Sequence, residues 1–363
     1  MIGYQNEPWQ YGWLARLDCD RYLASGYRVA FENFLPHLVV LLGDVFDEGS
    51  VADDEQFNAT LDRFMRIYGA SFERTKTLFL PGDNDVGGEG SEPVKPHRQE
   101  RFSRSFVSSL STAVQSELYK GLDLYDGFVF DGTFKRISAN TMEDSTIGAI
   151  KVLFSHARVL YPKYSGAKTV FNEIRPRLIL SGDDHRGRIL RLQTPRSKVD
   201  WFDLHESSDK LPLSFEIAAK TNTVTEIQTP TCSYRMGVPE MGFGALTLER
   251  TPQNGSFMVN YDILWLPHRF KQVFCYAYCG AVAGTLLAIC AGLALIAKCQ
   301  DSGTSAAQYS TPPYTWAMSG PGEDFAPPSP SPSSFAPKNS SSSPPLSLLL
   351  SLLSLDRSFP FCC

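Results

Sequence analysis

The chain has 363 residues, which is enough for one large domain with a full hydrophobic core or for two smaller domains. Its formal net charge of −5 argues against nucleic acid as a binding partner. Its eight cysteines include no Cys-x-x-Cys pair, which argues against a zinc ribbon.

The first hundred residues alternate between helical and strand patterns. Apolar side chains at helical spacing predict helices, and short unbroken apolar runs that end in glycine predict buried strands. Acidic residues at 53–55 complement the dipole at the start of the second helix. The expected elements are, in order, a helix over 22–35, a strand over 38–42, a helix over 53–67, a strand over 77–80 and a loop over 87–99.

The next part of the chain is richer in strand patterns. We expect a weak helix over 102–119, a short strand over 127–131, and strands that end at 155 and 181 with a helix at about 167–175 between them. A strand over 189–192 is expected to pair with the strand before it, and the polar stretch 195–211 reads as an insert. Antiparallel strands over 213–218, 224–228, 243–248 and 257–265 are expected to complete a second sheet.

The C-terminal quarter has a different composition. Residues 273–297 carry no charged side chain, and this stretch is longer than the ~20 residues needed to cross a bilayer. Residues 300–346 are rich in serine and proline and cannot bury a core. Cys19 and Cys232 precede both segments and are either a disulfide of a lumenal domain or two unpaired buried thiols.

Four predicted strands end in side chains that bind metals. Because open α/β sheets place ligands at the carboxyl ends of their strands, these residues are expected to meet. Oxygen ligands mixed with imidazole suit Mn, Fe or Zn better than Ca. A single aspartate of this kind could equally cap the next helix, but the repetition of the pattern favours a site. The residues are Asp44 with Asp47, then Asp83 with Asn84 and Asp85, then His156, then Asp183 with Asp184 and His185.

These strand ends resemble the calcineurin-like metallophosphoesterases, whose motifs are Asp-x-His, Gly-Asp-x-x-Asp, Gly-Asn-His-Asp, a lone histidine and Gly-His-x-His. The segments 43–47, 82–85, 156 and 182–185 follow the last four of these in order. The longer segments 43–49 and 230–248 are similar to the membrane-anchored branch that removes ethanolamine phosphate from the glycan of GPI anchors.

The resemblance implies an α/β fold, a β-sandwich flanked by helices, followed by one C-terminal transmembrane helix. It divides the chain into a phosphoesterase domain over 1–267, the membrane helix over 273–297 and a disordered tail over 300–363. The family's first motif is expected upstream of residue 1, so the first metal has lost ligands in this chain.

The resemblance also implies a role for each site residue. Two divalent metals, of the Mn type, are expected, with Asp44 bridging them. The second metal would be held by Asp83, His156 and Asp183, and the first by His185. Asp47, Asp85 and Asp184 are expected to orient the loop or the ligands.

Asn84 stands where the family has the histidine that protonates the leaving oxygen. An amide cannot transfer that proton, and loss of a general acid typically costs ~10²–10⁴ in rate. Asp183 replaces a histidine, but a carboxylate still binds hard metals.

The sequence therefore favours a metal-dependent phosphodiesterase of the ER or Golgi membrane that acts on the glycan of GPI-anchored proteins and supports their transport. The alternative is a catalytically impaired relative that acts as a membrane cargo adaptor or glycan-binding protein.

Overall fold

The computed structural model describes residues 2–3, 9–88, 92–106, 121–130, 133–136, 149–160, 170–171, 173–193, 198–251 and 255–307. It confirms a mixed α/β architecture with one C-terminal apolar helix. The chain falls into two compact units, Met1–Gln272 and Val273–Cys363, which are described separately below. Parts of the helices predicted over 102–119 and 167–175 lie outside the described residues.

The first elements follow the predicted order, but the helices are longer. They are α1 (Trp9–Phe34), β1 (Leu38–Leu41), α2 (Asp54–Phe72), β2 (Lys76–Phe79), α3 (Asp83–Val86) and α4 (Pro96–Ser105). A capping box between Asp53 and Gln56 fixes the start of α2, as the acidic run predicted. The predicted loop over 87–99 gives way to α4, because Pro96 occupies the first helical position, where its fixed φ suits a helix.

The largest sheet has seven strands in the order β4-β3-β5-β6-β10-β7-β8. In that order the strands are Thr133–Arg136, Leu122–Phe130, Ile150–Ser155, Leu178–Ser181, Thr223–Gln228, Arg188–Gln193 and Lys198–Asp203. Strands β3, β5, β6 and β10 run parallel, so their carboxyl ends lie at one edge of the sheet.

Three predictions about this sheet are wrong. β7 does not pair with β6, because β10 lies between them, parallel to β6 and antiparallel to β7. The strand predicted over 224–228 for the second sheet is β10 of this sheet, and all of its residues except Thr223 are buried. The polar insert over 195–211 contains β8, which pairs with β7 at the edge of the sheet.

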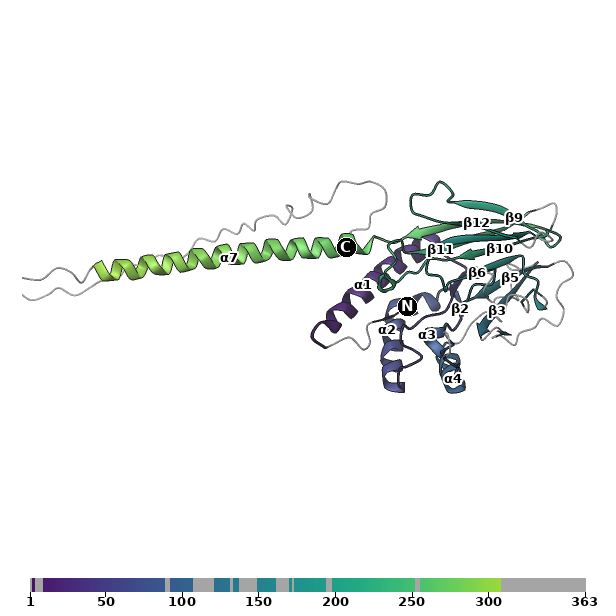
Figure 1. Cartoon of the computed structure of the whole chain (residues 1–363), viewed down its shortest axis with the longest axis horizontal. Helices are drawn as coiled ribbons and strands as arrows, with labels where there is room; N and C mark the ends of the chain where they lie inside the picture. Colours follow the sequence, from purple (N-terminus) through teal and green to yellow (C-terminus); the bar gives the residue numbers. More distant parts are fainter. Residues whose placement is uncertain are drawn as a thin grey trace, which may run out of the picture. The chain divides into compact units, whose positions relative to one another are not determined.

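A three-stranded antiparallel sheet, β11-β12-β9, lies over the larger one (Figure 1). Its strands are Gly242–Arg250, Phe257–Trp265 and Leu213–Ile217. In β5, Val152 and Phe154 pack into one core with Val259 and Tyr261 of β12, while Leu153 points to a second core on the opposite face. This alternation is what a strand buried between two layers requires, and the predicted β-sandwich is confirmed.

A third core lies around α1, α2 and the parallel pair β1-β2. Phe46 is fully buried there and makes edge contacts with the rings of Phe57, Phe64 and Phe106. Because Phe46 follows the first site aspartate by two residues, this aromatic cluster anchors the loop that carries the site.

The unit that begins at Val273 contains most of α7 (Arg269–Ala307). Its stretch Phe270–Gln300 is long and apolar enough to cross a membrane, and it includes the predicted span over 273–297. The helix continues through residue 307, so the first residues of the tail expected over 300–363 are helical. Residues 308–363 lie outside the described part of the chain.

Cys19 and Cys232 are free thiols, as in the second of the two alternatives, but only Cys19 is buried and Cys232 is half-buried. Burial is the main cause that raises the pKa of Cys19 to about 11, so its thiol stays protonated at neutral pH.

Candidate metal centre

Three side chains from the ends of β1, β2 and β5 meet at one point. Asp44, Asp83 and His156 each place a ligand atom within 4.8 Å of the other two. The Nε2 atom of His156 lies 2.9 Å from Oδ1 of Asp83 and 3.5 Å from Oδ1 of Asp44. The parallel course of β1 and β2 brings the two aspartates to the same edge, although they are far apart in sequence.

A tight left-handed turn brings Asp44 into this position. Gly43 has φ +94° and Asp44 has φ 53°. A Cβ on Gly43 would lie 2.4 Å from Nδ1 of His156, so this position requires glycine both for its backbone angle and for space. Aspartate is among the few other residues that tolerate the left-handed region.

Asp85 joins two aspartate loops, the loop after β1 that carries Asp44 and the loop after β2 that carries Asp83. Its carboxylate accepts hydrogen bonds from the backbone N–H groups of Val45, Phe46 and Gly82 at 3.0, 2.8 and 2.9 Å. Burial and the nearby Asp44 carboxylate raise its pKa to about 7 although these three donors favour the charged form. Asp85 thus joins the two loops, and its role in orienting metal ligands stays a prediction.

His156 is oriented by a backbone carbonyl. Its Nδ1 lies 2.7 Å from the oxygen of Leu42, so Nδ1 carries a proton that it donates there and Nε2 faces the carboxylates. Burial lowers the pKa of His156, but Asp44, Asp83 and Asp183 together outweigh it and raise the pKa to about 10. The same carboxylates favour any cation held at Nε2.

Asn84 holds Asp44 in place. Its backbone N–H donates to Oδ1 of Asp44 at 3.1 Å, and its side-chain Nδ2 donates to Oδ2 at 3.0 Å. The residue in the position of the family's general acid is therefore engaged with Asp44 and offers no titratable proton.

The last predicted group, on the loop after β6, lies beside this cluster. Oδ2 of Asp183 is 3.4 Å from Nε of Arg158, and Asp184 bridges Arg158 and Arg188 at 2.8 and 2.5 Å. Burial raises the pKa of Asp183, with Arg158 and His156 acting against it. His185, at φ 59°, is close enough to Asp83 to lower the pKa of that carboxyl.

The structure thus brings together three of the five predicted metal ligands. Asp183 and His185 lie within electrostatic range of the three-residue group but outside it, and their roles as ligands stay predictions. Asp47 forms a close ion pair with Arg235 and so fastens its loop to the segment 230–237.

Glu226, on the interior strand β10, is a supporting residue that the sequence analysis missed. It is fully buried and accepts hydrogen bonds from the hydroxyl of Ser181 at 2.7 Å and the backbone N–H groups of Val159 and Leu160 at 3.0 and 2.6 Å. It therefore joins the loop after His156 to the end of β6. A glutamate inside an otherwise strand-forming run was the available signal, but its burial follows from the position of β10 in the sheet.

Replacing Glu226 with glutamine is expected to lower the free energy of unfolding by about 1–3 kcal/mol, since the amide cannot accept from all three donors. We also expect metal affinity to fall by about 10–100-fold, because the loop behind His156 loses its anchor. Urea denaturation and calorimetric metal titration measure the two effects. Glu249→Gln, on the exposed part of β11, is the matched control and should change neither. Unchanged metal affinity in Glu226→Gln would contradict the anchoring role.

Two carboxylates and one imidazole, all held by backbone contacts, are suitable ligands for a divalent metal ion. Their second contacts, from Asn84 to Asp44 and from His156 to the carbonyl of Leu42, are the kind that orient ligands around a metal. The residues present therefore fit such an ion at Asp44, Asp83 and His156.

Known proteins resemble parts of this chain. No family model matches the chain. It is similar to Cell division control protein 1 of Saccharomyces cerevisiae, with 20% identity over 307 residues that cover 75% of this chain. It is also similar to Metallophosphoesterase 1 of Danio rerio, with 29% identity over 94 residues, and to a Metallophosphoesterase 1 homolog of Drosophila melanogaster, with 29% identity over 75 residues. The chain is metallophosphoesterase-like.

The two metallophosphoesterase similarities cover 26% and 21% of this chain. The chain in turn spans 57% of the yeast protein, 24% of the zebrafish protein and 20% of the fly protein. The similarity and the Asp-Asp-His group together confirm the resemblance predicted from the strand ends.

Proposed function

We propose that this metallophosphoesterase-like chain is a divalent-metal-dependent phosphodiesterase. The observation that supports this most strongly is the meeting of Asp44, Asp83 and His156 after the carboxyl ends of β1, β2 and β5. A bound divalent ion would supply a nucleophilic hydroxide near neutral pH and offset charge on the phosphoryl oxygens. The protein's own part is to hold the ligands: Asn84 fixes Asp44, and Asp85 fixes both aspartate loops.

The charges at the site favour a diester over a monoester. Asp44 and Asp83 face the metal position, and Asp183 lies beside them, whereas both carboxylate oxygens of Asp184 are paired with arginines. Several carboxylates around one site disfavour a doubly charged phosphate monoester more than a singly charged diester. We propose ethanolamine phosphate on the glycan of GPI-anchored proteins as the diester, and two Mn-type ions as the metals, from the resemblance of segments 43–49 and 230–248.

The test uses the full chain purified in detergent micelles and stripped of metal by chelation. Hydrolysis of bis(p-nitrophenyl) phosphate and of p-nitrophenyl phosphate is measured after Mn, Zn or Mg is added back. The proposal expects metal-dependent turnover of the diester that exceeds turnover of the monoester. Retained metal affinity without turnover of either substrate would select the alternative, a membrane adaptor or glycan-binding relative, which Asn84 favours.

Replacing Asn84 with histidine is expected to raise turnover of diesters that have a poor leaving group. An imidazole at this position supplies the missing proton donor, a gain of up to ~10²-fold. The measurement compares an alkyl diester with bis(p-nitrophenyl) phosphate. Because p-nitrophenolate leaves without protonation, its rate should change little and serves as the internal control. Equal changes for both substrates would show that the substitution altered metal binding and not proton transfer.

We propose that α7 anchors the domain in the ER or Golgi membrane with the domain on the lumenal side. The apolar stretch of α7 and the resemblance to the membrane-anchored branch support this placement. Asn58, in the triplet Asn58-Ala59-Thr60, lies on an exposed face of α2 and would be open to glycosylation there. An endoglycosidase-sensitive mobility shift in microsomes that Asn58→Gln removes would support the lumenal side, and protease digestion of the domain in intact microsomes would exclude it.

A further inference from the structure

The outer side of α1 carries an apolar patch near its N-terminal end. The side chains of Trp13, Leu14 and Leu17 are 56%, 53% and 58% exposed. Residues three and four positions apart are neighbours on a helix surface, so Leu17 adjoins both of the others and the three form one patch. Single exposed apolar side chains are ordinary on a protein surface, whereas a contiguous group that includes a tryptophan indicates an interaction surface.

Two arginines continue the same side of α1. Arg21 lies one turn beyond Leu17, Arg28 lies two turns beyond Arg21, and both side chains are exposed. The acidic residues of this helix are half-buried or already paired with an arginine: Asp18, Asp20 and Glu32. The exposed side of α1 therefore changes along its length from apolar to cationic.

The middle of α1 is packed against the segment that leads into the apolar stretch of α7. The hydroxyl of Tyr22 donates to the carbonyl of Pro267 at 2.9 Å. The apolar stretch begins at Phe270, and three residues of chain span at most about 11 Å, so it starts close to this contact. Trp13 lies about 14 Å from Tyr22 along the helix axis. The patch is therefore within reach of the surface of a bilayer that the apolar stretch enters.

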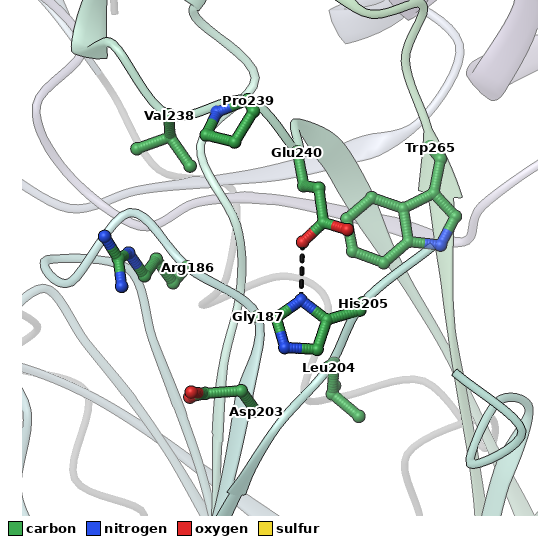
Figure 2. Close-up of a pocket in the computed structure, with 9 residues that line it drawn as sticks. All are labelled: Arg186, Gly187, Asp203, Leu204, His205, Val238, Pro239, Glu240 and Trp265. Carbon is green, nitrogen blue, oxygen red and sulfur yellow. Dashed lines mark hydrogen bonds and ion pairs between the residues drawn. The ribbon is translucent and has the colours of Figure 1, made fainter. Parts of the chain in front are cut away.

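The two residues before Pro267 point in different directions. Leu266 packs on α1, where a Cβ on Gly26 would lie 2.5 Å from its Cδ2. Trp265 lines a hollow on another part of the domain with His205 and Glu240, which are hydrogen-bonded to each other (Figure 2). Trp265 is thus occupied by contacts within the domain, whereas more than half of the Trp13 side chain is exposed.

We propose that this side of α1 rests on the surface of the phospholipid bilayer that α7 crosses. Trp13, Leu14 and Leu17 insert at the level of the headgroups, where tryptophan is enriched in membrane proteins. Arg21 and Arg28 keep their charged ends at the surface and pair with headgroup phosphates. The inference goes beyond phosphodiesterase activity and rests on the proposed anchoring by α7.

A second copy of the chain fits this patch less well than lipid does. A stable interface between proteins buries at least ~1,200 Å² in total, and three partly exposed side chains supply far less. The two arginines would also need acidic partners on the other copy, whereas every phospholipid headgroup carries a phosphate.

Tryptophan quenching by brominated lipid tests the contact. The full chain is reconstituted at one copy per nanodisc, so that no second copy can cover α1, in phospholipid that carries bromine on the upper part of its acyl chains. We expect the bromine to quench wild-type fluorescence relative to unbrominated lipid, and Trp13→Phe and Leu17→Glu each to lose most of this difference. Trp201→Phe is the matched control and should keep it, because Trp201 is 59% exposed but lies on β8.

Flotation with liposomes separates this contact from the anchoring on which it rests. A full chain that does not float overturns the anchoring by α7 and the inference with it. A chain that floats but shows equal quenching in wild type and Trp13→Phe overturns the contact of α1 while the anchoring stands. Protection of Trp13 from iodide only in nanodiscs that hold two copies would show a contact between copies and also overturn it. Neither measurement uses turnover, so a lack of phosphodiesterase activity does not affect the result.

Discussion

Replacing Asp44 with asparagine is expected to weaken metal binding by more than ~100-fold, the largest effect of any single substitution at the site. Asp44 is the one ligand whose two oxygens are both fixed, by the backbone and side chain of Asn84, and it faces His156 across 3.5 Å. Asparagine keeps the size of the side chain and tolerates the left-handed backbone at φ 53°, so the substitution removes the charge and one of the two acceptors that face Asn84. Elemental analysis and calorimetric titration of the purified full chain measure bound metal.

Two controls make this result specific. Asp47→Asn breaks the ion pair with Arg235 but leaves the three-residue group intact, so it should lower stability and keep the metal. His185→Ala is expected to cost one ion at most, because the predicted role of His185 is to serve a single metal. Equal metal stoichiometry in Asp44→Asn and His185→Ala would overturn the shared-ligand role of Asp44.

Replacing Gly82 with alanine is expected to lower the free energy of unfolding by about 3 kcal/mol and to release the metal. The new Cβ would lie 2.1 Å from Oδ1 and 2.3 Å from the backbone nitrogen of Asp44. The carboxylate could rotate away, but the backbone nitrogen is fixed by the turn, so the two aspartate loops must separate. The φ of Gly82 is −108°, which alanine adopts freely, and the expected effect is therefore steric.

Gly69→Ala, within α2, is the matched control. Its Cβ would meet only the side chain of Met65, with the nearest atom at 3.4 Å, so we expect unchanged stability or a gain of about 0.5–1 kcal/mol. Urea denaturation with and without added metal measures both variants. If Gly82→Ala unfolds at the wild-type midpoint and retains its metal, the close approach of the two loops is not required for the site.

The sequence by itself determined the strands that carry the site and the residues at their ends. Unbroken apolar runs before Asp44 and His156 predict strands, of which β5 is buried and β1 half-buried, and open α/β sheets place ligands at the carboxyl ends of such strands. The candidate membrane span in α7 could also be predicted from the sequence, because its length and lack of charge are local properties.

Only the tertiary structure determines which of those side chains come close enough together to hold one metal ion. Asp44, Asp83 and His156 meet because two left-handed residues turn the chain after β1 and because Asp85 binds backbone donors from both aspartate loops. Asp183 has the same kind of position in sequence, but its neighbour is Arg158, whose approach depends on the path of the loop after β5.

The order of the strands in the sheet also depends on tertiary contacts. β10 reads as polar in sequence, but Ser181 and the N–H groups of Val159 and Leu160 satisfy Glu226, so the strand can lie buried between β6 and β7. A buried carboxylate is tolerable only when donors surround it, and these donors come from two distant segments. Local sequence indicates which residues can form a strand. Hydrogen-bond donors from distant segments determine whether a strand that contains a carboxylate can be buried in the sheet.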